Sequence, residues 1–303
     1  MDFDTTPYLD CAGRRLPLNR TSIMGVLNLT PDSFSDGGRY GSVGAAVDAA
    51  LRMVADGAHI IDVGGESTRP GSQSVDVSEE LGRVIPVIEQ LVASCDVPIS
   101  VDTSKPEVMR AAIGAGAGMV NDVRALAANG ALSAVADSNV AVCLMHMQGM
   151  PETMQHSPDY AEVVNEVQRF LAERMLAAEF AGIERKRMVV DPGFGFGKTL
   201  QHNLALLAQL ERFEELECPL LVGLSRKSML GAITGEDDPG RRLSASVAAA
   251  LIAVQHGARI VRVHDVAATA DALAVWSAVA PLRRTKTESE TSAPSLADLF
   301  DDD

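Results

Sequence analysis

The chain has 303 residues, of which 47% are hydrophobic, and its formal net charge is −15 at pH 7. Single α/β domains reach about 250 residues, so the length does not require a second domain. No apolar run approaches the roughly 18 residues of a membrane-spanning helix. The acidic balance disfavours binding to nucleic acid or to an anionic membrane surface, so an anionic substrate would have to be held by local cations.

The first residues and the cysteines bear on the cellular compartment. Met1 is followed by acids at positions 2 and 4, where a signal peptide needs basic residues. The 4 cysteines are far apart and form no Cys-x-x-Cys motif, which fits neither a zinc site nor a disulfide framework. We therefore expect a soluble cytoplasmic protein with reduced thiols.

Residues 1–22 precede the first long apolar run and form an N-terminal extension. Short apolar stretches lie on both sides of Ala12 and Gly13, a pair suited to a tight turn. This pattern predicts a hairpin that covers one end of the domain.

Short apolar segments then recur along the chain, and a polar residue follows at or near the end of each one. The segments are 23–27, 60–61, 98–101, 118–120, 142–145, 188–190, 220–222 and 260–261. The polar residues are Asn28, Asp62, Asp102, Asn121, His146, Asp191, Ser225 and the pair Arg262 and His264. Each gap is long enough for a crossover, and most gaps have helical periodicity, most clearly at 81–92 and also at 42–55. Parallel strands that alternate with helices are therefore expected.

Eight such units predict a closed (β/α)8 barrel, the TIM-barrel architecture, as a single domain over residues 23–282. In this fold the active site lies at the carboxyl ends of the strands, so the strand-end residues are also the site candidates. A doubly wound open sheet is the alternative, and it would use only the groups near its switch point. Residues 283–303 lose the apolar periodicity and become rich in Ser, Thr and acids, which predicts a disordered acidic tail.

Two glycine-rich loops follow the first two strands. The first contains Phe34, and the second contains Thr68, Arg69 and Pro70. Long loops beside a rigid barrel suit a lid over a reactive intermediate, although plain surface connections are the alternative. The Thr-Arg pair in the second loop favours a functional role.

Strand parity and motif spacing narrow the remaining candidates. Asn121 keeps the parity of Met119, so we expect Asn121 rather than Asp122 to point into the barrel. The run at 191–199 has Pro192 where a P-loop needs glycine, so its glycines are better explained by a close approach to a flat ligand, with Phe196 stacked on it. The run at 223–227 departs from the Gly-x-Ser-x-Gly motif of serine hydrolases, which leaves Ser225 and Lys227 at the mouth of the barrel.

Arg262 and His264 share one face of the last strand, because they are two residues apart. Loops seven and eight commonly bind phosphate in this fold, and a buried cation needs an anion nearby. Anion binding is therefore the favoured role, with a structural ion pair as the alternative.

Together these residues suggest two sides of one site. One side has the carboxylates of Asp102 and Asp191, the amide of Asn121 and the ammonium of Lys227. These groups suit a flat, polar heterocycle. Asn28, Arg262 and His264 are expected on the other side, beside a phosphorylated tail, and the Asn28 oxygen suits Mg²⁺.

The chain resembles bacterial dihydropteroate synthases from residue 24 to about residue 279. The motifs that carry the resemblance are MGVLNLTPDSFSDGG at 24–38, DVGGESTRPG at 62–71, DTSKP at 102–106, ND at 121–122, DPGFGFGK at 191–198, SRK at 225–227 and RVH at 262–264. The resemblance implies condensation of 6-hydroxymethyl-7,8-dihydropterin diphosphate with 4-aminobenzoate, which gives 7,8-dihydropteroate and diphosphate in folate biosynthesis. It also implies inhibition by sulfonamides and a homodimer formed through outer helices.

The resemblance assigns site residues in three groups. The pterin would be held by Asp102, Asn121, Asp191 and Lys227, with Met145 and Phe196 beside it. The diphosphate would be held by Asn28, Arg69, Arg262 and His264 together with Mg²⁺. The aminobenzoate pocket would be shaped by Phe34, Thr68, Pro70, Ser225 and Lys227.

Two other functions stay open at this stage. A pterin-binding methyltransferase that works with a corrinoid protein has a similar barrel, but it has no use for a diphosphate clamp. A pterin-binding protein without catalytic activity is the alternative outside the enzymes.

Overall fold

In the computed structural model, the residues described are 7–29, 39–67, 71–72, 74–150 and 153–290. Eight parallel strands form one sheet in the order β8-β7-β6-β5-β4-β3-β10-β9. The strands are β3 (Ser22–Asn28), β4 (Ile60–Gly64), β5 (Ile99–Asp102), β6 (Met119–Asp122), β7 (Ala141–Met145), β8 (Met188–Asp191), β9 (Leu221–Val222) and β10 (Ile260–Val263). A parallel bridge between Val190 and Leu220 joins the two ends of the sheet. The predicted (β/α)8 barrel is therefore confirmed, and the open sheet is wrong.

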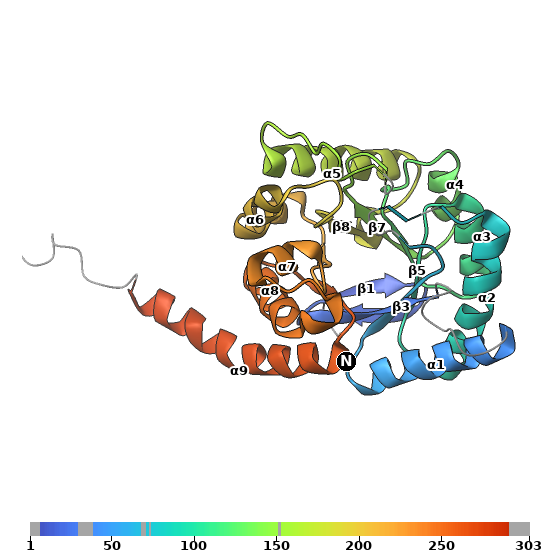
Figure 1. Ribbon diagram of the computed structural model, residues 1–303, viewed down its shortest axis with the longest axis horizontal. Coiled ribbons are helices and arrows are strands. Elements are labelled where there is room, and N and C mark those ends of the chain that lie inside the picture. Colours follow the sequence, from blue (N-terminus) through green and yellow to red (C-terminus); the bar gives the residue numbers. More distant parts are fainter. Residues whose placement is uncertain (1–6, 30–38, 68–70, 73, 151–152, 291–303) are drawn as a thin grey trace, which may run out of the picture.

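Helices connect the strands and surround the barrel (Figure 1). They are α1 (Arg39–Ala55), α2 (Val77–Ser94), α3 (Pro106–Gly114), α4 (Ala131–Ala136), α5 (Val163–Phe180), α6 (Leu200–Ala208), α7 (Ser228–Thr234), α8 (Leu243–Gln255) and α9 (Val266–Glu290). Short 3-10 helices occupy Arg185–Arg187, Leu210–Leu216 and Pro239–Arg241. Among the described residues, none of the helices is both long enough and apolar enough to cross a membrane.

Helix α9 extends past residue 283, where we expected the tail to begin, and it ends at Glu290. That expectation came from the loss of apolar periodicity. The residues from 283 to 290 are largely Arg, Lys and Glu, which have good helix propensity, so polarity alone does not end the helix. Residues 291–303 lie outside the described residues.

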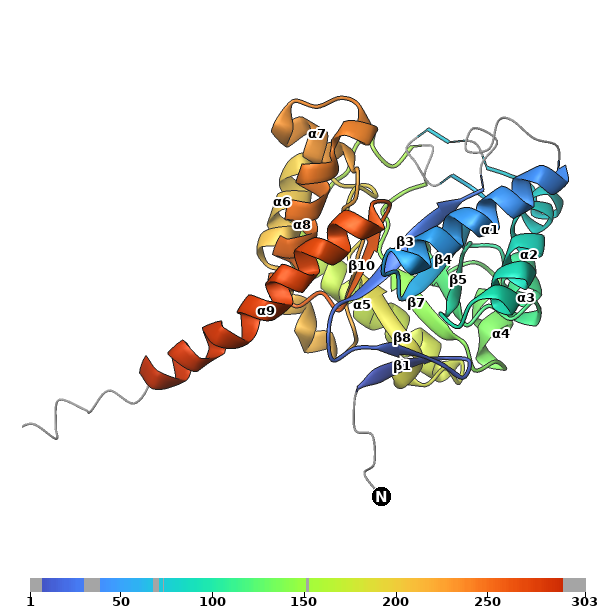
Figure 2. The same ribbon diagram turned by 90° about the horizontal axis from the view of Figure 1, so that it is seen from below.

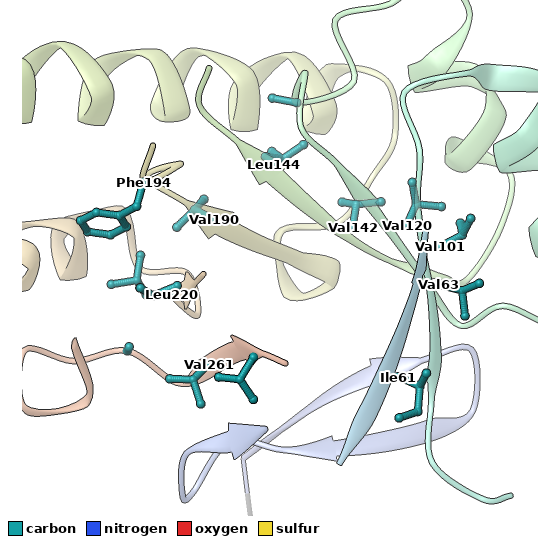
Figure 3. Packing of buried hydrophobic residues seen from close by; sticks show 14 of the residues in the cluster. Ile61, Val63, Val101, Val120, Val142, Leu144, Val190, Phe194, Leu220 and Val261 are labelled. Atoms are coloured by element: carbon teal, nitrogen blue, oxygen red, sulfur yellow. The ribbon is translucent and has the colours of Figure 1, made fainter. Parts of the chain in front are cut away.

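The alternation of side chains along each strand separates two environments. Ile61 and Val63, on either side of Asp62, belong to the large core between the barrel and its helices. Figure 3 shows them together with Val101, Val120 and other residues of this outer core. Because successive side chains of a strand point to opposite faces, Asp62 points into the barrel.

Two short strands, β1 (Tyr8–Cys11) and β2 (Arg14–Pro17), form an antiparallel hairpin ahead of the barrel. The side chains of Leu9, Cys11 and Leu16 are at most 1% exposed. They pack against the inward side chains at the amino ends of the strands, which are Met24, Ile60, Met119, Ala141, Cys143, Val189, Leu221 and Ile260. The hairpin therefore covers the end of the barrel opposite the strand-end residues (Figure 2).

The contact between the hairpin and Gly118, the residue before strand β6, yields a stability prediction. A Cβ added at Gly118 would lie 2.4 Å from the carbonyl oxygen of Cys11, so Gly118→Ala must displace backbone of the hairpin. We expect the free energy of unfolding, measured in urea, to fall by about 1–3 kcal/mol. Gly114→Ala is the matched control, because nothing lies within 4 Å of its added Cβ. Equal stability of the two variants would show that the hairpin is not seated as described.

Candidate active site

Arg262 lies at the centre of a buried polar layer at the carboxyl ends of the strands. Its Nε donates to Asp62 Oδ2 at 2.6 Å, and its Nη2 donates to Asp102 Oδ2 at 2.8 Å. Asn121 Nδ2 donates to the same Asp62 oxygen at 3.1 Å. Strands β4, β5, β6 and β10 thus bring four polar side chains into direct contact, and Asn121 points inward as expected from its parity.

These contacts correct the expected division of the site into two sides. Arg262 was expected beside the anion and apart from the carboxylates, but it is hydrogen-bonded to Asp102. The reason is the pairing of β10 with β3, which places β10 near β4 and β5 in the sheet although these strands are far apart in the chain. Asp122, by contrast, accepts from the backbone N–H groups of Arg124 and Leu126 and is taken up by local structure.

Burial sets the protonation of the two carboxylates on which pterin binding was expected to depend. It raises the pKa of Asp102 to about 7, although Arg262 opposes this shift. It also raises the pKa of Asp191 to about 6, against a 2.7 Å hydrogen bond from the Gly193 N–H. Both groups therefore lose their charge within about one unit of each other as the pH falls below neutral.

The surroundings shift the pKa values of the two cations, Lys227 and Arg262, in opposite directions. Burial, together with Arg262, lowers the pKa of Lys227 to about 8. Burial alone would lower the pKa of Arg262, but Asp62 and Asp102 outweigh it and raise that pKa. Arg262 is thus a permanent charge, whereas Lys227 changes its charge close to neutral pH.

An apolar wall borders the polar layer. Lys227 Nζ lies 4.1 Å from the ring centroid of Phe196, which is close enough for a cation–π interaction. Phe196 packs in a small buried cluster with Met145, Val123 and Met154. A wall of this kind beside carboxylates and an ammonium suits a flat ring with a polar edge.

The glycine-rich run after β8 folds around a lysine that the sequence analysis did not assign. Lys198 Nζ donates to the carbonyl oxygens of Gly193 and Phe196 at 2.8 and 3.1 Å, and it lies 2.9 Å from His146 Nδ1. Gly193 has a φ of +69°, and an added Cβ would lie 1.9 Å from the His146 carbonyl oxygen, so only glycine fits. The loop thus turns carbonyls toward its own lysine, whereas a P-loop turns N–H groups toward phosphate, and the sequence-based exclusion of a P-loop is confirmed.

The ends of β9 and β10 are joined by a second set of contacts. Ser225 Oγ accepts from the His264 backbone N–H at 3.2 Å and lies 3.0 Å from His264 Nδ1. Arg226 donates to both carboxylate oxygens of Asp265, at 3.0 and 2.6 Å. This bidentate pair keeps Ser225 and His264 together.

Asn28, at the end of β3, is the residue expected to bind Mg²⁺. A Cβ added at the neighbouring Gly64 would lie 3.8 Å from both Asn28 Oδ1 and Asp102 Oδ2. The glycine therefore leaves space beside the Asn28 oxygen, and oxygen ligands are those that Mg²⁺ prefers, whereas Asp102 Oδ2 already accepts from Arg262. The described residues contain no group of three or more His, Cys, Asp or Glu side chains arranged to hold a metal ion. Asn28 would therefore hold a Mg²⁺ ion only together with ligands other than the described side chains, such as water.

The sequence analysis did not identify Lys198 as a residue of this site, and it named Asp62 as a strand-end candidate without giving it a role. Asp62 had the same strand-end signal as Asp102, but its contacts to Arg262 and Asn121 cross the barrel and leave no trace in spacing. Phe34, Thr68, Arg69 and Pro70 lie outside the described residues.

Comparisons with known proteins agree with this geometry. The family model described as "Pterin binding enzyme" matches residues 24–264. Dihydropteroate synthase of Escherichia coli (strain K12) is 52% identical over 274 residues, which cover 90% of this chain and 97% of that protein.

Two solved structures of Xanthomonas albilineans dihydropteroate synthase have the same fold. The one with 4-aminobenzoic acid has a TM-score of 0.86 and 59% identity, and it covers 91% of this chain and 98% of that chain. The one in complex with 7,8-dihydropteroate has a TM-score of 0.82 and 56% identity, with 90% and 98% covered. The barrel, its buried polar layer and these matches together show that the chain belongs to the dihydropteroate synthase family of pterin-binding transferases.

Proposed function

We propose that the buried polar layer centred on Arg262 carries out the reaction of this family. That reaction joins 6-hydroxymethyl-7,8-dihydropterin diphosphate to 4-aminobenzoate and yields 7,8-dihydropteroate and diphosphate, a step of folate biosynthesis. The observation that carries the proposal is the contact of Arg262 with Asp62 and Asp102, beside Asn121, at the carboxyl ends of the strands.

The pterin ring is held by Asp102, Asn121, Asp191 and Lys227. An ionised carboxylate accepts two N–H groups from an amino-pyrimidinone edge, while the amide both donates and accepts. Phe196 and Met145 supply the apolar wall for the face of the ring. Charged hydrogen bonds of this kind contribute about 1.5–3 kcal/mol each, so the buried carboxylates dominate the affinity.

The diphosphate lies toward Arg262 and His264, with Arg69 added from the loop after β4. The bond between the pterin methylene carbon and the diphosphate oxygen breaks, and its electron pair leaves with diphosphate. Arg262 and His264 offset the charge that develops on the leaving group, and the electron-rich pterin stabilises the cationic methylene. When bound by Asn28, Mg²⁺ supplies further positive charge to the diphosphate.

The amine of 4-aminobenzoate then attacks the methylene carbon, a C–N bond forms, and the amine loses a proton to solvent. We assign its pocket to Phe34, Thr68, Pro70, Ser225 and Lys227, where sulfonamides would compete with it. A corrinoid-linked methyltransferase is less well supported, because it has no use for Arg262 and His264 as a diphosphate clamp. A non-catalytic pterin-binding protein is less well supported because the motifs of the first two loops are intact.

We also propose that the protein works in the cytoplasm. All 4 cysteines lie in the described part of the chain and are free thiols, which fits a reducing compartment. Recovery of the protein from a membrane or an export fraction of fractionated cells would contradict this.

A homodimer through α8 and α9 completes the proposal. Ile252 on α8 and Val275 and Val279 on α9 are 42%, 67% and 46% exposed, and α9 projects from the barrel in both views (Figures 1 and 2). Exposed apolar side chains on neighbouring helices are typical of a surface that a second subunit covers.

The dimer gives a prediction for sedimentation. We expect the protein to sediment as a dimer at micromolar concentration and Val275→Asp to sediment as a monomer, because a buried unpaired carboxylate opposes association. Phe180→Asp on α5, where the side chain is 90% exposed, is the control and should remain dimeric. A monomeric unmodified protein would exclude the dimer.

Turnover is the direct test of the function. Incubation of the protein with the pterin diphosphate, 4-aminobenzoate and Mg²⁺ is expected to yield dihydropteroate and diphosphate, both measurable by chromatography. A chelator should stop product formation, and added Mg²⁺ should restore it. Binding of the pterin without any product would favour the non-catalytic alternative.

The pKa values of the carboxylates predict the pH dependence of pterin binding. A carboxylate with a raised pKa is charged above that pKa, so affinity should fall as the pH drops through about 7 for Asp102 and about 6 for Asp191. Asp191→Asn should weaken binding at least tenfold at pH 7.5, since a charged hydrogen bond contributes about 1.5–3 kcal/mol. Calorimetry at several pH values measures both effects. Glu173→Gln, an exposed carboxylate on α5, is the control, and unchanged affinity in Asp191→Asn would remove Asp191 from the site.

A further inference from the structure

Asp62 is fully buried, and it contacts residues from two different parts of the site. Its Oδ2 accepts from both Arg262 and Asn121, at 2.6 and 3.1 Å. Its other oxygen, Oδ1, has no hydrogen-bond partner among the described residues. Asp62 therefore holds two neighbours through a single oxygen.

The guanidinium of Arg262 donates to two carboxylates through two different nitrogens. Its Nε bonds to Asp62 and its Nη2 bonds to Asp102, so the planar guanidinium is held at two points. If Asp102 accepts from a pterin ring, the bond to Asp62 still keeps the guanidinium in place. Without Asp62, Arg262 would be free to pair fully with Asp102 and to compete with the ring for it.

We propose that Asp62 is a positioning residue for both ends of the substrate: its Oδ2 holds Arg262 beside Asn121, and its charge limits how strongly Arg262 pairs with Asp102. The inference rests on the proposed function, because it assumes that Asp102 binds the pterin and Arg262 the diphosphate.

The charge of Asp62 has an effect that a purely structural residue would lack. Asp102 faces Arg262, Asp62, Asp122 and Glu80, and its own charge acts on Lys227. After burial, the negative charge of Asp62 is one of the causes that raise the pKa of Asp102 to about 7. Removal of this charge lowers the pKa of Asp102. The pKa of Asp191, about 6, depends on burial, Gly193, Lys227, Lys198 and Arg262, so it is not directly affected.

The variant Asp62→Asn tests the effect of the Asp62 charge alone, because the buried polar layer can accommodate an amide at this position. The amide oxygen can accept from Arg262 and Asn121 in place of Oδ2. The amide nitrogen then occupies the position of Oδ1, where the carboxylate has no partner. Ser100, adjacent to Asp62 in register on β5, has a buried hydroxyl oxygen that likewise lacks a partner among the described residues. The substitution therefore removes the charge and keeps the shape.

The experiment measures kcat, KM and kcat/KM for the pterin diphosphate between pH 5 and 8 in the unmodified protein, Asp62→Asn and Ser100→Ala. In the unmodified protein kcat/KM should fall below pH 7, following Asp102. In Asp62→Asn this acid limb should move toward pH 6, where Asp191 takes over, and KM should rise about tenfold because Arg262 competes for Asp102. Ser100→Ala removes a buried oxygen beside Asp62 without touching Arg262, and its acid limb should stay in place.

The results for the two variants either support or overturn the proposed role of Asp62. An acid limb and a KM that do not change in Asp62→Asn would overturn the proposal, as would equal shifts in Asp62→Asn and Ser100→Ala. If Asp62→Asn does not fold, Asp62→Ser, which also removes the charge, takes its place under the same expectations. If the unmodified protein makes no product, the proposed function fails, and calorimetric titration of a pterin over the same pH range then tests Asp62 separately.

Discussion

The pairing of one guanidinium with two buried carboxylates is the constraint on which the active end of this barrel depends. A charge removed from water is costly unless it is paired and hydrogen-bonded. Arg262 meets this condition only because Asp62 and Asp102 reach it from β4 and β5. Removal of either carboxylate would leave Arg262 only partly compensated, so the three side chains act as a unit.

The other end of the barrel makes this pairing possible. The hairpin residues Leu9, Cys11 and Leu16 close the amino ends of the strands with an apolar layer. This apolar layer separates the polar layer from solvent at that end of the barrel. Burial raises the pKa values of Asp102 and Asp191 and lowers that of Lys227, so the groups proposed to hold the pterin titrate near neutral pH.

Lys198 and His146 show how the loop after β8 is maintained. Lys198 Nζ donates to two carbonyls of the loop and lies beside His146; burial lowers the pKa of Lys198 to about 7, and burial with Lys198 nearby lowers the pKa of His146 to about 3. His146 is thus neutral at working pH and accepts from the lysine. The Phe196 carbonyl accepts from Lys198 and the Asp191 carboxylate accepts from the Gly193 N–H, so the same loop holds both residues.

Local patterns in the sequence determined the elements of this protein. The alternation of apolar segments with helical stretches predicted eight parallel strands, and one polar residue at each strand end predicted where Asp102, Asn121 and Asp191 would lie. Both predictions rest on short-range periodicity, which a single sequence displays directly. The contacts of Arg262 with Asp62 and Asp102 were decided only by the tertiary structure. They join residues far apart in the chain, and they exist because β10 pairs with β3 and so lies near β4 and β5, a long-range constraint that no local spacing encodes.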